Sequence, residues 1–189
     1  MGYLFVDLDK TLIHCTSFSR ELTFLVKKEG LYGFMKKVYS KKAFSKLQLK
    51  TLVSEYNLNL DYSGCLNKEV LRSVLEFRSL GYRVILATGA MTKSAKNIVY
   101  SWDFVDEVIG STVHSNLKGT NKLKSIVDRV GDSSFVYMGD SRYDLVIFNE
   151  AQFSYLVSSS LPLKLVAGIR YRNRIKFLRK GKCFHDLIP

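Results

Sequence analysis

Apolar runs alternate along the chain with segments whose apolar positions recur at helical spacing. Continuous apolar runs are typical of strands buried on both faces, and they predict strands at residues 4–6, 82–87, 105–109, 134–138 and 153–157. Helical spacing predicts helices at residues 69–80, 92–100 and 121–130, and another from Ser141 onward. Because strands that alternate with helices form right-handed βαβ units, we expect an α/β fold with a Rossmann-like parallel sheet.

The segment between the first two predicted strands has a different pattern. From Thr16 to about Asn57 its apolar residues recur at helical spacing, and Gly30 is the expected end of a first helix. Because these helices interrupt the alternation of strands and helices, we expect a small all-helical cap inserted after the first strand. The expected organisation is a core of residues 1–13 and 64–163, a cap of residues 14–63 and a basic C-terminal tail of residues 164–189.

The basic residues are concentrated in two segments. The 189-residue chain carries a net charge of +12, and residues 14–63 hold nine lysines and arginines against four acidic residues. Residues 164–186 hold eight basic residues against one acidic residue, and the rest of the chain holds twelve of each. This distribution indicates that the cap and the tail each present a surface to an anionic partner.

The tail mixes basic side chains with large apolar ones, among them Ile175, Phe177 and Leu178. Three interpretations compete: a helix packed on the core with its charges outward, a helix on a membrane surface, and a nucleic-acid-binding patch. We take the packed helix as the default. An anionic membrane surface, met by the cap and the tail, is the second choice, and nucleic acid comes third because no recognised binding module accompanies the charge.

Three features of the sequence bear on the cellular compartment. Its apolar stretches are shorter than a membrane span, and the chain starts directly on a predicted strand without a signal-like segment. The cysteines Cys15, Cys65 and Cys183 are scattered and lack metal-type spacing, which is typical of reduced thiols. We therefore expect a cytoplasmic protein, with peripheral membrane association as an alternative that the basic segments add.

Several of the predicted strands end in polar residues. Asp7 and Asp9 follow the first strand, Thr88 follows the second, and Asp140 follows a later one. Because the carboxyl ends of parallel strands lie at one edge of a sheet, we expect these residues to converge there. Asp144 adds a carboxylate one helical turn after Asp140. Neighbouring carboxylates repel one another unless a cation neutralises them, and Mg²⁺ does so with oxygen ligands.

Candidate phosphate ligands lie in the same region. Thr88 and Gly89 stand just before a predicted helix N-terminus, where a hydroxyl and backbone amides favour an anion. Lys118 lies in a loop ahead of the next helix and can reach the same phosphate oxygens. Lys122, one turn later, is the alternative, and we favour Lys118 because it lies in the loop and not in the helix. Arg20, at the start of the cap, is a candidate for binding the substrate, although surface pairing explains it nearly as well.

Taken in order, these residues resemble the four motifs of the haloacid dehalogenase-like (HAD) phosphohydrolases. The matching segments are Asp7-Leu8-Asp9-Lys10-Thr11, Leu86-Ala87-Thr88-Gly89, Lys118 and Gly139-Asp140-Ser141-Arg142-Tyr143-Asp144. The resemblance runs from Gly2 to about Ser158, and the ordered set at strand ends is far more specific than any single motif. Lys10 replaces the glycine that often follows the second acid of the first motif.

The resemblance implies a phosphoryl-transfer mechanism. Asp7 would attack phosphorus and become an aspartyl-phosphate, while Asp9 would protonate the leaving oxygen and then activate water. Thr88 and Lys118 would hold the transferring group. Family members that cleave carbon–halogen bonds lack the second acid, so the presence of Asp9 favours phosphoryl transfer to water.

The resemblance also implies a Mg²⁺ cofactor. Its ligands would be the Asp7 carboxylate, the Asp9 backbone carbonyl and Asp140, with Asp144 as a ligand or as support for one. A helical cap between the first two motifs is typical of the phosphoserine-phosphatase-like branch, where it closes the site and reads the substrate. A further likeness is to the HAD domain fused to some UbiA-type prenyltransferases, which has a similar Asn-Leu-Lys-Gly and Gly-Asp-Ser run.

We therefore expect a Mg²⁺-dependent phosphomonoesterase that hydrolyses a small or lipid-linked phosphorylated metabolite through an aspartyl-phosphate. Two alternatives stay open: a phosphotransferase of the same family, and a basic membrane- or nucleic-acid-binding module whose site is vestigial. The intact residues Asp7, Asp9, Lys118 and Asp140 argue against a vestigial site, because a decayed site has no chemical reason to keep all four.

Overall fold

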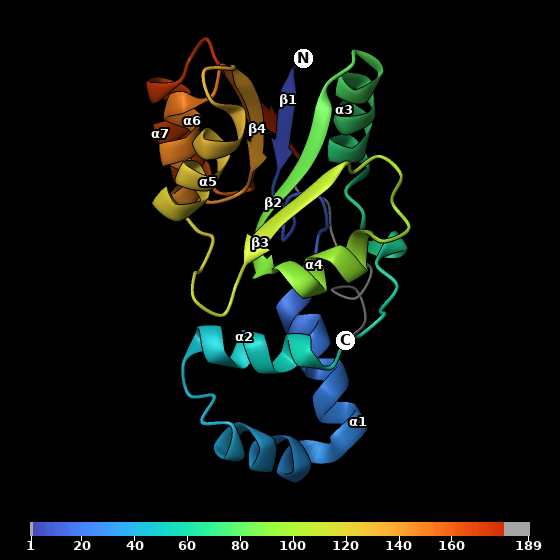
Figure 1. The fold of residues 1–189 in the computed structure, drawn as a ribbon. Coiled ribbons are helices and arrows are strands. Elements are labelled where there is room, and N and C mark those ends of the chain that lie inside the picture. The colour runs from blue at the N-terminus through green and yellow to red at the C-terminus, as the bar shows by residue number, and fades with distance from the viewer. Residues whose placement is uncertain (1, 180–189) are drawn as a thin grey trace.

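A six-stranded sheet forms the centre of the molecule, and all its neighbouring strands are parallel (Figure 1). The computed structural model describes residues 2–179. Its strand order is β3-β2-β1-β4-β5-β6, so β1 lies in the interior of the sheet. The strands are β1 (Tyr3–Val6), β2 (Arg83–Met91), β3 (Glu107–Ser111), β4 (Phe135–Gly139), β5 (Phe153–Val157) and β6 (Ile175–Leu178). The predicted α/β fold with a Rossmann-like parallel sheet is confirmed.

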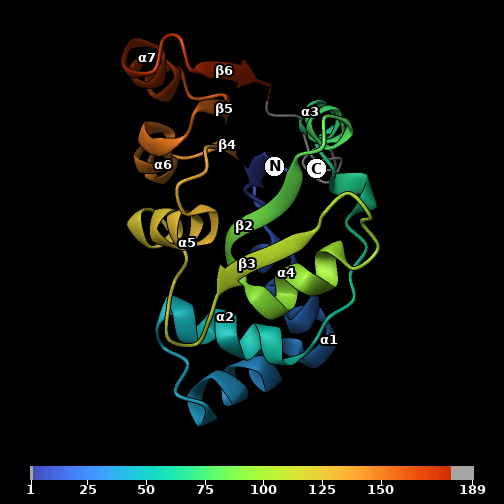
Figure 2. The same ribbon diagram turned by 45° about the horizontal axis from the view of Figure 1, so that its top comes forward.

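Helices cover both faces of this sheet (Figure 2). Two of them pack on one face, namely α3 (Lys68–Ser79) and α4 (Thr92–Val99). Three pack on the other face, namely α5 (Thr120–Val130), α6 (Leu145–Glu150) and α7 (Leu161–Arg170). Since side chains alternate across a strand, Val6 of β1 faces the first group of helices and Phe5 faces the second. Such a doubly covered strand has to be apolar throughout, as residues 4–6 are.

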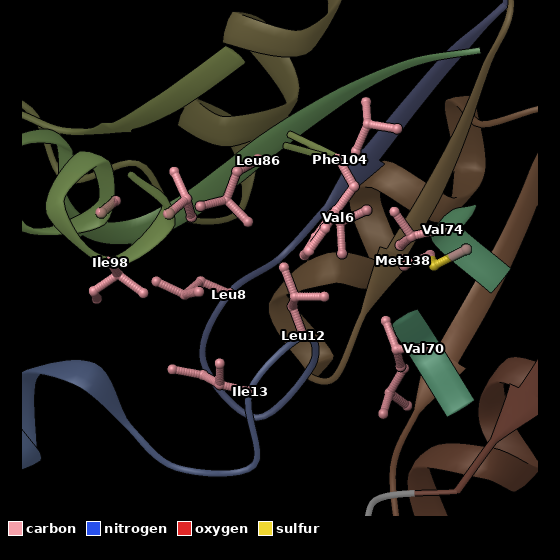
Figure 3. Close-up of a cluster of buried hydrophobic side chains, with 14 of the residues drawn as sticks. Val6, Leu8, Leu12, Ile13, Val70, Val74, Leu86, Ile98, Phe104 and Met138 are labelled. Atoms are coloured by element: carbon pink, nitrogen blue, oxygen red, sulfur yellow. The ribbon is translucent and has the colours of Figure 1, made fainter. Parts of the chain in front are cut away.

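The register of the sheet aligns the ends of its central strands. Val6 of β1 is paired with Leu86 of β2 on one side and with Met138 of β4 on the other. The same three side chains belong to one hydrophobic cluster, in which Met138 lies near Val74 of α3 (Figure 3). Because the three strands are in register, Asp7 after β1, Thr88 in the extended end of β2 and Asp140 after β4 come to the same edge of the sheet.

The turn after β1 is fixed by buried apolar side chains and main-chain hydrogen bonds. Leu12 N donates to Asp7 O (3.2 Å) and Ile13 N donates to Leu8 O (3.0 Å). Lys10 lies in the left-handed region with φ 62°, which costs a residue with a Cβ about 1 kcal/mol and is more accessible to glycine. The turn therefore explains why a glycine would be favoured at this position.

Two helices form the cap at the carboxyl edge of the sheet (Figure 1). They are α1 (Ser17–Ser40) and α2 (Lys46–Glu55), and they enclose a hydrophobic cluster of their own around Leu25, Phe34 and Leu52. Gly30 (φ 77°) interrupts α1, as expected, but the chain resumes the helix at once and α1 continues as a kinked element. The predicted all-helical cap after the first strand is confirmed.

Some element boundaries differ from the predictions. Strand β2 continues past Gly89 to Met91, and a register shift against β3 falls between Ala87 and Met91. Helix α4 begins at Thr92, where the predicted helix of residues 92–100 begins, and Met91 is its N-cap. The Thr92 hydroxyl donates to Ser111 O (3.1 Å) and so joins α4 to β3.

The described part of the predicted basic tail belongs to the core, and the expectation of a packed helix holds only for its first residues. Residues 164–170 belong to α7, which packs on the sheet, whereas residues 175–178 form β6, a sixth strand that pairs in parallel with β5. Leu178 is buried in the same cluster as Val6, while Lys176 and Phe177 are exposed. Burial does not alternate along these four residues, so they lack the period-two pattern that predicts a strand. Residues 180–189, including Cys183, lie outside the described residues.

Among residues 2–179, none of the helices combines the length and the apolar character that crossing a membrane requires.

Candidate active site

A lysine and two aspartates from distant parts of the chain meet at the carboxyl edge of the sheet. Lys122 Nζ donates to Asp7 Oδ1 (2.9 Å) and lies 3.5 Å from Asp144 Oδ1. The same Nζ donates to the Tyr137 hydroxyl (3.0 Å), which in turn donates to Asp144 Oδ1 (2.7 Å). All four side chains are buried, so the contacts form a closed network below the surface.

Burial and mutual contact set the charge states in this network. Burial raises the pKa of Asp7 to about 7, Lys122 opposes that rise, and Asp144 and Asp140 add to it. Burial also lowers the pKa of Lys122, but Asp7 and Asp144 outweigh it, so the pKa of Lys122 lies above its usual value. The pKa of Asp144 is lowered because Lys122 and hydrogen bonds from Tyr137 and Ser141 outweigh its burial. The ammonium of Lys122 is thus held charged between the two carboxyl groups.

The carboxylates of Asp7, Asp140 and Asp144 form a cluster that fits a hard divalent cation. Each offers an oxygen, and these oxygens lie within 4.8 Å of one another. Both oxygens of Asp144 already accept hydrogen bonds, Oδ1 from Tyr137 and Oδ2 from the amide and hydroxyl of Ser141 (3.0 and 2.7 Å). These hydrogen bonds fix the position of the Asp144 carboxylate beside Asp7 and Asp140.

Gly139, at the end of β4, allows the side chains of Tyr137 and Asp144 to approach the backbone closely. A Cβ at Gly139 would lie 2.7 Å from the Tyr137 ring and 2.8 Å from Asp144 Cγ. Neither neighbour is the free end of a flexible side chain, because both belong to the buried network. The glycine that precedes Asp140 is therefore required by the close approach of Asp144.

Asp9 connects the first turn of the core to the cap. Its Oδ1 accepts a hydrogen bond from the amide of Ser17 (2.7 Å), the first residue of α1. Burial raises the pKa of Asp9, although the hydrogen bonds to Ser17 and the charges of Lys50 and Lys122 oppose the rise. A carboxyl group with a raised pKa keeps its proton more readily, which suits a proton donor.

Thr88 and Gly89 line the site where β2 passes the cluster. The Thr88 hydroxyl is buried and accepts from the amide of Ala90 (3.1 Å). The carbonyl of Gly89 accepts from the Ser111 hydroxyl (3.0 Å) and from Nζ of Lys50 in α2 (2.6 Å). The cap therefore contacts the core through Lys50, and no pattern in the sequence predicts this contact.

The structure places Lys122, and not Lys118, against Asp7. Lys118 lies at the rim of the cavity with its Nζ 3.6 Å from the centre of the Tyr143 ring. The preference for Lys118 rested on its place in a loop, but Lys122 shares the buried face of α5 with Ile126 and Val130. Their spacing of four residues is the signal that could have identified Lys122, because a lysine on the apolar stripe of a helix points toward the sheet.

Arg20 lies away from the cavity and holds the cap to the returning chain. Its guanidinium donates to the carbonyl of Asp61 (2.9 Å) and to Sγ of Cys65 (2.7 Å). It also stacks over the ring of Tyr62, 4.9 Å from the ring centre. These partners hold the guanidinium at the linker that returns from the cap to the core, so Arg20 does not line the site as the sequence led us to expect.

A cavity of about 480 Å³ opens above the aspartate cluster, between the cap and the core. The core contributes Asp7, Asp9, Lys10, Thr88, Gly89, Asn116, Leu117, Lys118, Lys122, Asp140, Ser141, Tyr143 and Asp144. The cap and its linker contribute Thr16, Phe18, Ser19, Lys46 and Lys50. The candidate residues of all four motifs, together with the alternative Lys122, thus line one space large enough for a small ligand.

No sequence-family profile and no curated protein sequence matches the chain. Solved structures match its fold. They include a phosphoserine phosphohydrolase-like protein from Francisella tularensis subsp. tularensis SCHU S4 (TM-score 0.57, 13% identity, 93% of this chain and 95% of that one). They also include a haloacid dehalogenase-like family hydrolase from Streptococcus pneumoniae (TM-score 0.55, 17% identity, 99% and 97%).

A substrate-bound phosphoserine phosphatase also matches, with a TM-score of 0.55 and 14% identity over 99% of this chain and 97% of that one. At these identities the likeness concerns the fold. The chain therefore has the fold of the haloacid dehalogenase-like hydrolases. The solved structures that share it over almost their whole length include phosphatases.

Glu21 is a buried acid at the boundary between the cap and the core. Its Oε2 accepts a hydrogen bond from the hydroxyl of Ser94 in α4 (3.2 Å). Burial raises its pKa from 4.5 to about 7, and the charge of Asp9 contributes to the rise. In the unfolded chain Glu21 ionises at its ordinary pKa, so it should lower the stability of the folded protein as pH rises from about 4.5 to about 7.

We predict that Glu21→Gln stabilises the protein above pH 7 by ~1–3 kcal/mol, because the amide keeps an acceptor for Ser94 and cannot ionise. Near pH 4 the two proteins should be equally stable, since Glu21 is then neutral in both states. Urea unfolding measured between pH 4 and 8 checks this. Glu150→Gln, at an exposed position on α6, serves as the control and should leave the curve unchanged. If the difference in unfolding free energy between Glu21→Gln and the wild type did not change with pH, the raised pKa of Glu21 would be contradicted.

Proposed function

We propose that this protein is a Mg²⁺-dependent phosphomonoesterase that acts on a small or lipid-linked phosphorylated metabolite through an aspartyl-phosphate. The observation that carries this proposal is the position of Lys122 between Asp7 and Asp144, within the carboxylate cluster that includes Asp140. A nucleophile, a fixed cation and a divalent-cation site at the floor of one cavity are the parts that phosphoryl transfer needs. The shared fold with phosphatases supports the same choice.

In the first step, a carboxylate oxygen of Asp7 attacks phosphorus, and the bond between phosphorus and the leaving oxygen breaks. Asp9 gives its proton to that oxygen, so the leaving group departs as an alcohol. In the second step, Asp9 takes a proton from a water molecule that attacks the aspartyl-phosphate. Inorganic phosphate is released and the Asp7 carboxylate is restored.

The surrounding residues orient these groups and balance their charge. Lys122 holds the attacking carboxylate of Asp7 in place and offsets the charge of the phosphoryl oxygens, and the Thr88 hydroxyl faces the same space. Asp7, Asp140 and the backbone carbonyl of Asp9 would hold Mg²⁺, which would supply positive charge beside the transferring phosphoryl group. The cap closes over the cavity and limits the access of water.

The nucleophile assignment predicts that Asp7→Asn lowers turnover of a generic aryl phosphate by ~10³-fold or more, because a carboxamide is a poor nucleophile. Asp128→Asn, an exposed acid on α5, is the control and should keep wild-type turnover. A circular dichroism melt verifies that both variants fold. Wild-type turnover by Asp7→Asn would disprove the assignment.

A quench of the wild type during turnover of a ³²P-labelled substrate should trap label on Asp7. Chase with water or with an added alcohol then separates a hydrolase, which releases phosphate, from a phosphotransferase, which labels the alcohol.

The geometry also predicts which lysine serves the phosphoryl group. Lys122→Met should lower kcat/KM for the aryl phosphate by ~10²–10³-fold, because it removes the fixed cation beside Asp7. Lys118→Met removes a lysine stacked on Tyr143 at the rim and should cost less than about tenfold. Steady-state kinetics of the two variants, with thermal stability measured alongside, decide between them. If Lys118→Met lowered kcat/KM more than Lys122→Met, Lys118 and not Lys122 would be the lysine that serves the phosphoryl group.

We also propose that the cap rests on an anionic membrane surface, which would give access to lipid-linked substrates. The supporting observation is a group of exposed apolar side chains on the second half of α1 and the loop after it: Leu31 (66% exposed), Tyr32 (84%), Tyr39 (65%) and Phe44 (68%). The rings of Tyr39 and Phe44 are in contact (5.7 Å), so the group is continuous there. Lys36 and Lys42 are exposed among them, a mixture suited to an anionic interface.

The membrane proposal predicts that the wild type sediments with phosphatidylglycerol vesicles more than with phosphatidylcholine vesicles, and that added salt weakens the binding. The triple variant Leu31→Ser, Tyr39→Ser, Phe44→Ser should bind at least ~10-fold more weakly, since it removes the apolar contact.

The matched control is Leu161→Ser, Leu165→Ser, Ile169→Ser on the exposed face of α7, which should bind as the wild type does. Equal binding by the cap variant and the wild type would refute the membrane surface.

A further inference from the structure

The cavity above the aspartate cluster is lined by basic side chains from both the cap and the core. Besides Lys122 on the floor, the lysines that line it are Lys46 and Lys50 of α2, Lys10 after β1 and Lys118 before α5. Within the described residues, its acidic lining is limited to Asp7, Asp9, Asp140 and Asp144. Any group that extends from the floor toward the mouth therefore meets ammonium groups, hydroxyls and two aromatic rings, and among the described lining residues Asp9 is the one carboxylate outside the cluster of Asp7, Asp140 and Asp144.

Lys50 brings this positive charge close to the reacting groups. Its Nζ is half-buried and donates to the carbonyl of Gly89 (2.6 Å), next to Thr88. Burial lowers the pKa of Lys50, Asp9 opposes this, and the neighbouring charges of Lys46 and Lys118 lower it further. Lys46, Lys50 and Lys118 thus repel one another across the cavity, and an anion bound between them would reduce that repulsion.

We infer that the leaving group of the substrate carries a second anionic group, a carboxylate or a phosphate, which binds Lys46 and Lys50. The inference rests on the proposed phosphatase function and adds a substrate class to it. The aspartate cluster and Lys122 account for the transferring phosphoryl group, so the lysines at the mouth remain for the rest of the substrate. A charged hydrogen bond there would distinguish such a substrate from a neutral one by about tenfold or more.

The same lining disfavours a substrate with an ammonium group. An ammonium needs carboxylate or carbonyl acceptors, and it would instead face Lys46, Lys50 and Lys118 across the cavity. Phosphoserine carries such a group beside its carboxylate. We therefore expect this protein to differ in substrate from the phosphoserine phosphatases that share its fold.

Three substrates of equal length test the charge preference. Glycerol 1-phosphate has a neutral leaving group, 3-phosphoglycerate has a carboxylate, and phosphoserine has that carboxylate with an ammonium in place of the hydroxyl. We expect kcat/KM of the wild type to be about tenfold higher for 3-phosphoglycerate than for glycerol 1-phosphate, and lowest for phosphoserine. Equal or faster turnover of glycerol 1-phosphate, or a preference for phosphoserine, would overturn the inference.

Variants of the cap lysines connect the preference to named residues. Lys50→Gln should lower the ratio of kcat/KM between 3-phosphoglycerate and glycerol 1-phosphate by about tenfold, and Lys46→Gln, at an exposed position, by ~threefold. Lys46→Arg keeps the charge and should keep the ratio. Lys27→Gln, an exposed lysine of α1 outside the cavity, is the matched control and should also keep it. Unchanged ratios in both glutamine variants would refute the role of these lysines.

A binding measurement separates this inference from the proposed function. Isothermal titration of 3-phosphoglycerate and glycerol 1-phosphate into the Asp7→Asn protein does not depend on turnover. Tighter binding of 3-phosphoglycerate, reduced by Lys50→Gln in the same background, supports the anionic leaving group even if the wild type hydrolysed neither compound. Equal affinities would overturn it even if the phosphatase function held.

A last comparison identifies the source of the second anion. A soluble bisphosphate and a lipid phosphomonoester in detergent whose leaving alcohol carries a phosphodiester both present a second phosphate. Faster turnover of the bisphosphate than of glycerol 1-phosphate supports a soluble substrate of this class, and faster turnover of the lipid phosphomonoester supports a lipid-linked one. Failure of both, together with failure of 3-phosphoglycerate, would overturn the inference.

Discussion

The buried contact of Lys122 with Asp7 and Asp144 is the constraint on which the site depends. Carboxyl groups removed from water favour the neutral form, and the effect of burial on Asp7 is large. A lysine buried beside them reverses part of that effect and is itself kept charged by them. Each charge therefore requires the others, and removing one leaves a buried group without compensation. The aligned ends of β1 and β4 and the first turn of α5 have to be placed together for this network to form.

Hydrogen bonds also hold the cap to the core close to these buried charges. Ser17 at the start of α1 donates to Asp9, Lys50 of α2 donates to Gly89, and Glu21 of α1 accepts from Ser94 of α4. These hydrogen bonds join the cap to Asp9, to Gly89 in β2 and to the helix that follows β2. The aspartates and Lys122 on the floor of the cavity come from the core, while the other lysines that line it come from both parts, Lys46 and Lys50 from the cap and Lys10 and Lys118 from the core.

Much of the fold could be read from the sequence because buried parallel strands have a local signature. Strand β1 needs apolar residues on both faces, and residues 4–6 provide them directly before Asp7. The convergence of Asp7 and Asp140 followed from the rule that parallel strands end at one edge, and the structure brings their carboxylates together. Strand β6 was not predicted because its four residues do not alternate between buried and exposed positions and lie within a strongly basic segment.

By itself the sequence determined the layered sheet, the inserted helical cap and the ends at which acids would gather, since these depend on local periodicity and on the rules of parallel sheets. Only the tertiary structure decided which side chains meet. In the structure Lys122, which is 115 residues from Asp7 in the sequence, contacts that aspartate, whereas Lys118 lies at the rim of the cavity. Arg20 contacts the linker that returns from the cap, and Lys50 of the cap contacts Gly89 at the cavity. The physical reason is that the environment of a charged side chain is set by groups far away in the chain, and that environment, more than residue type, decides whether a lysine is solvated or belongs to a site.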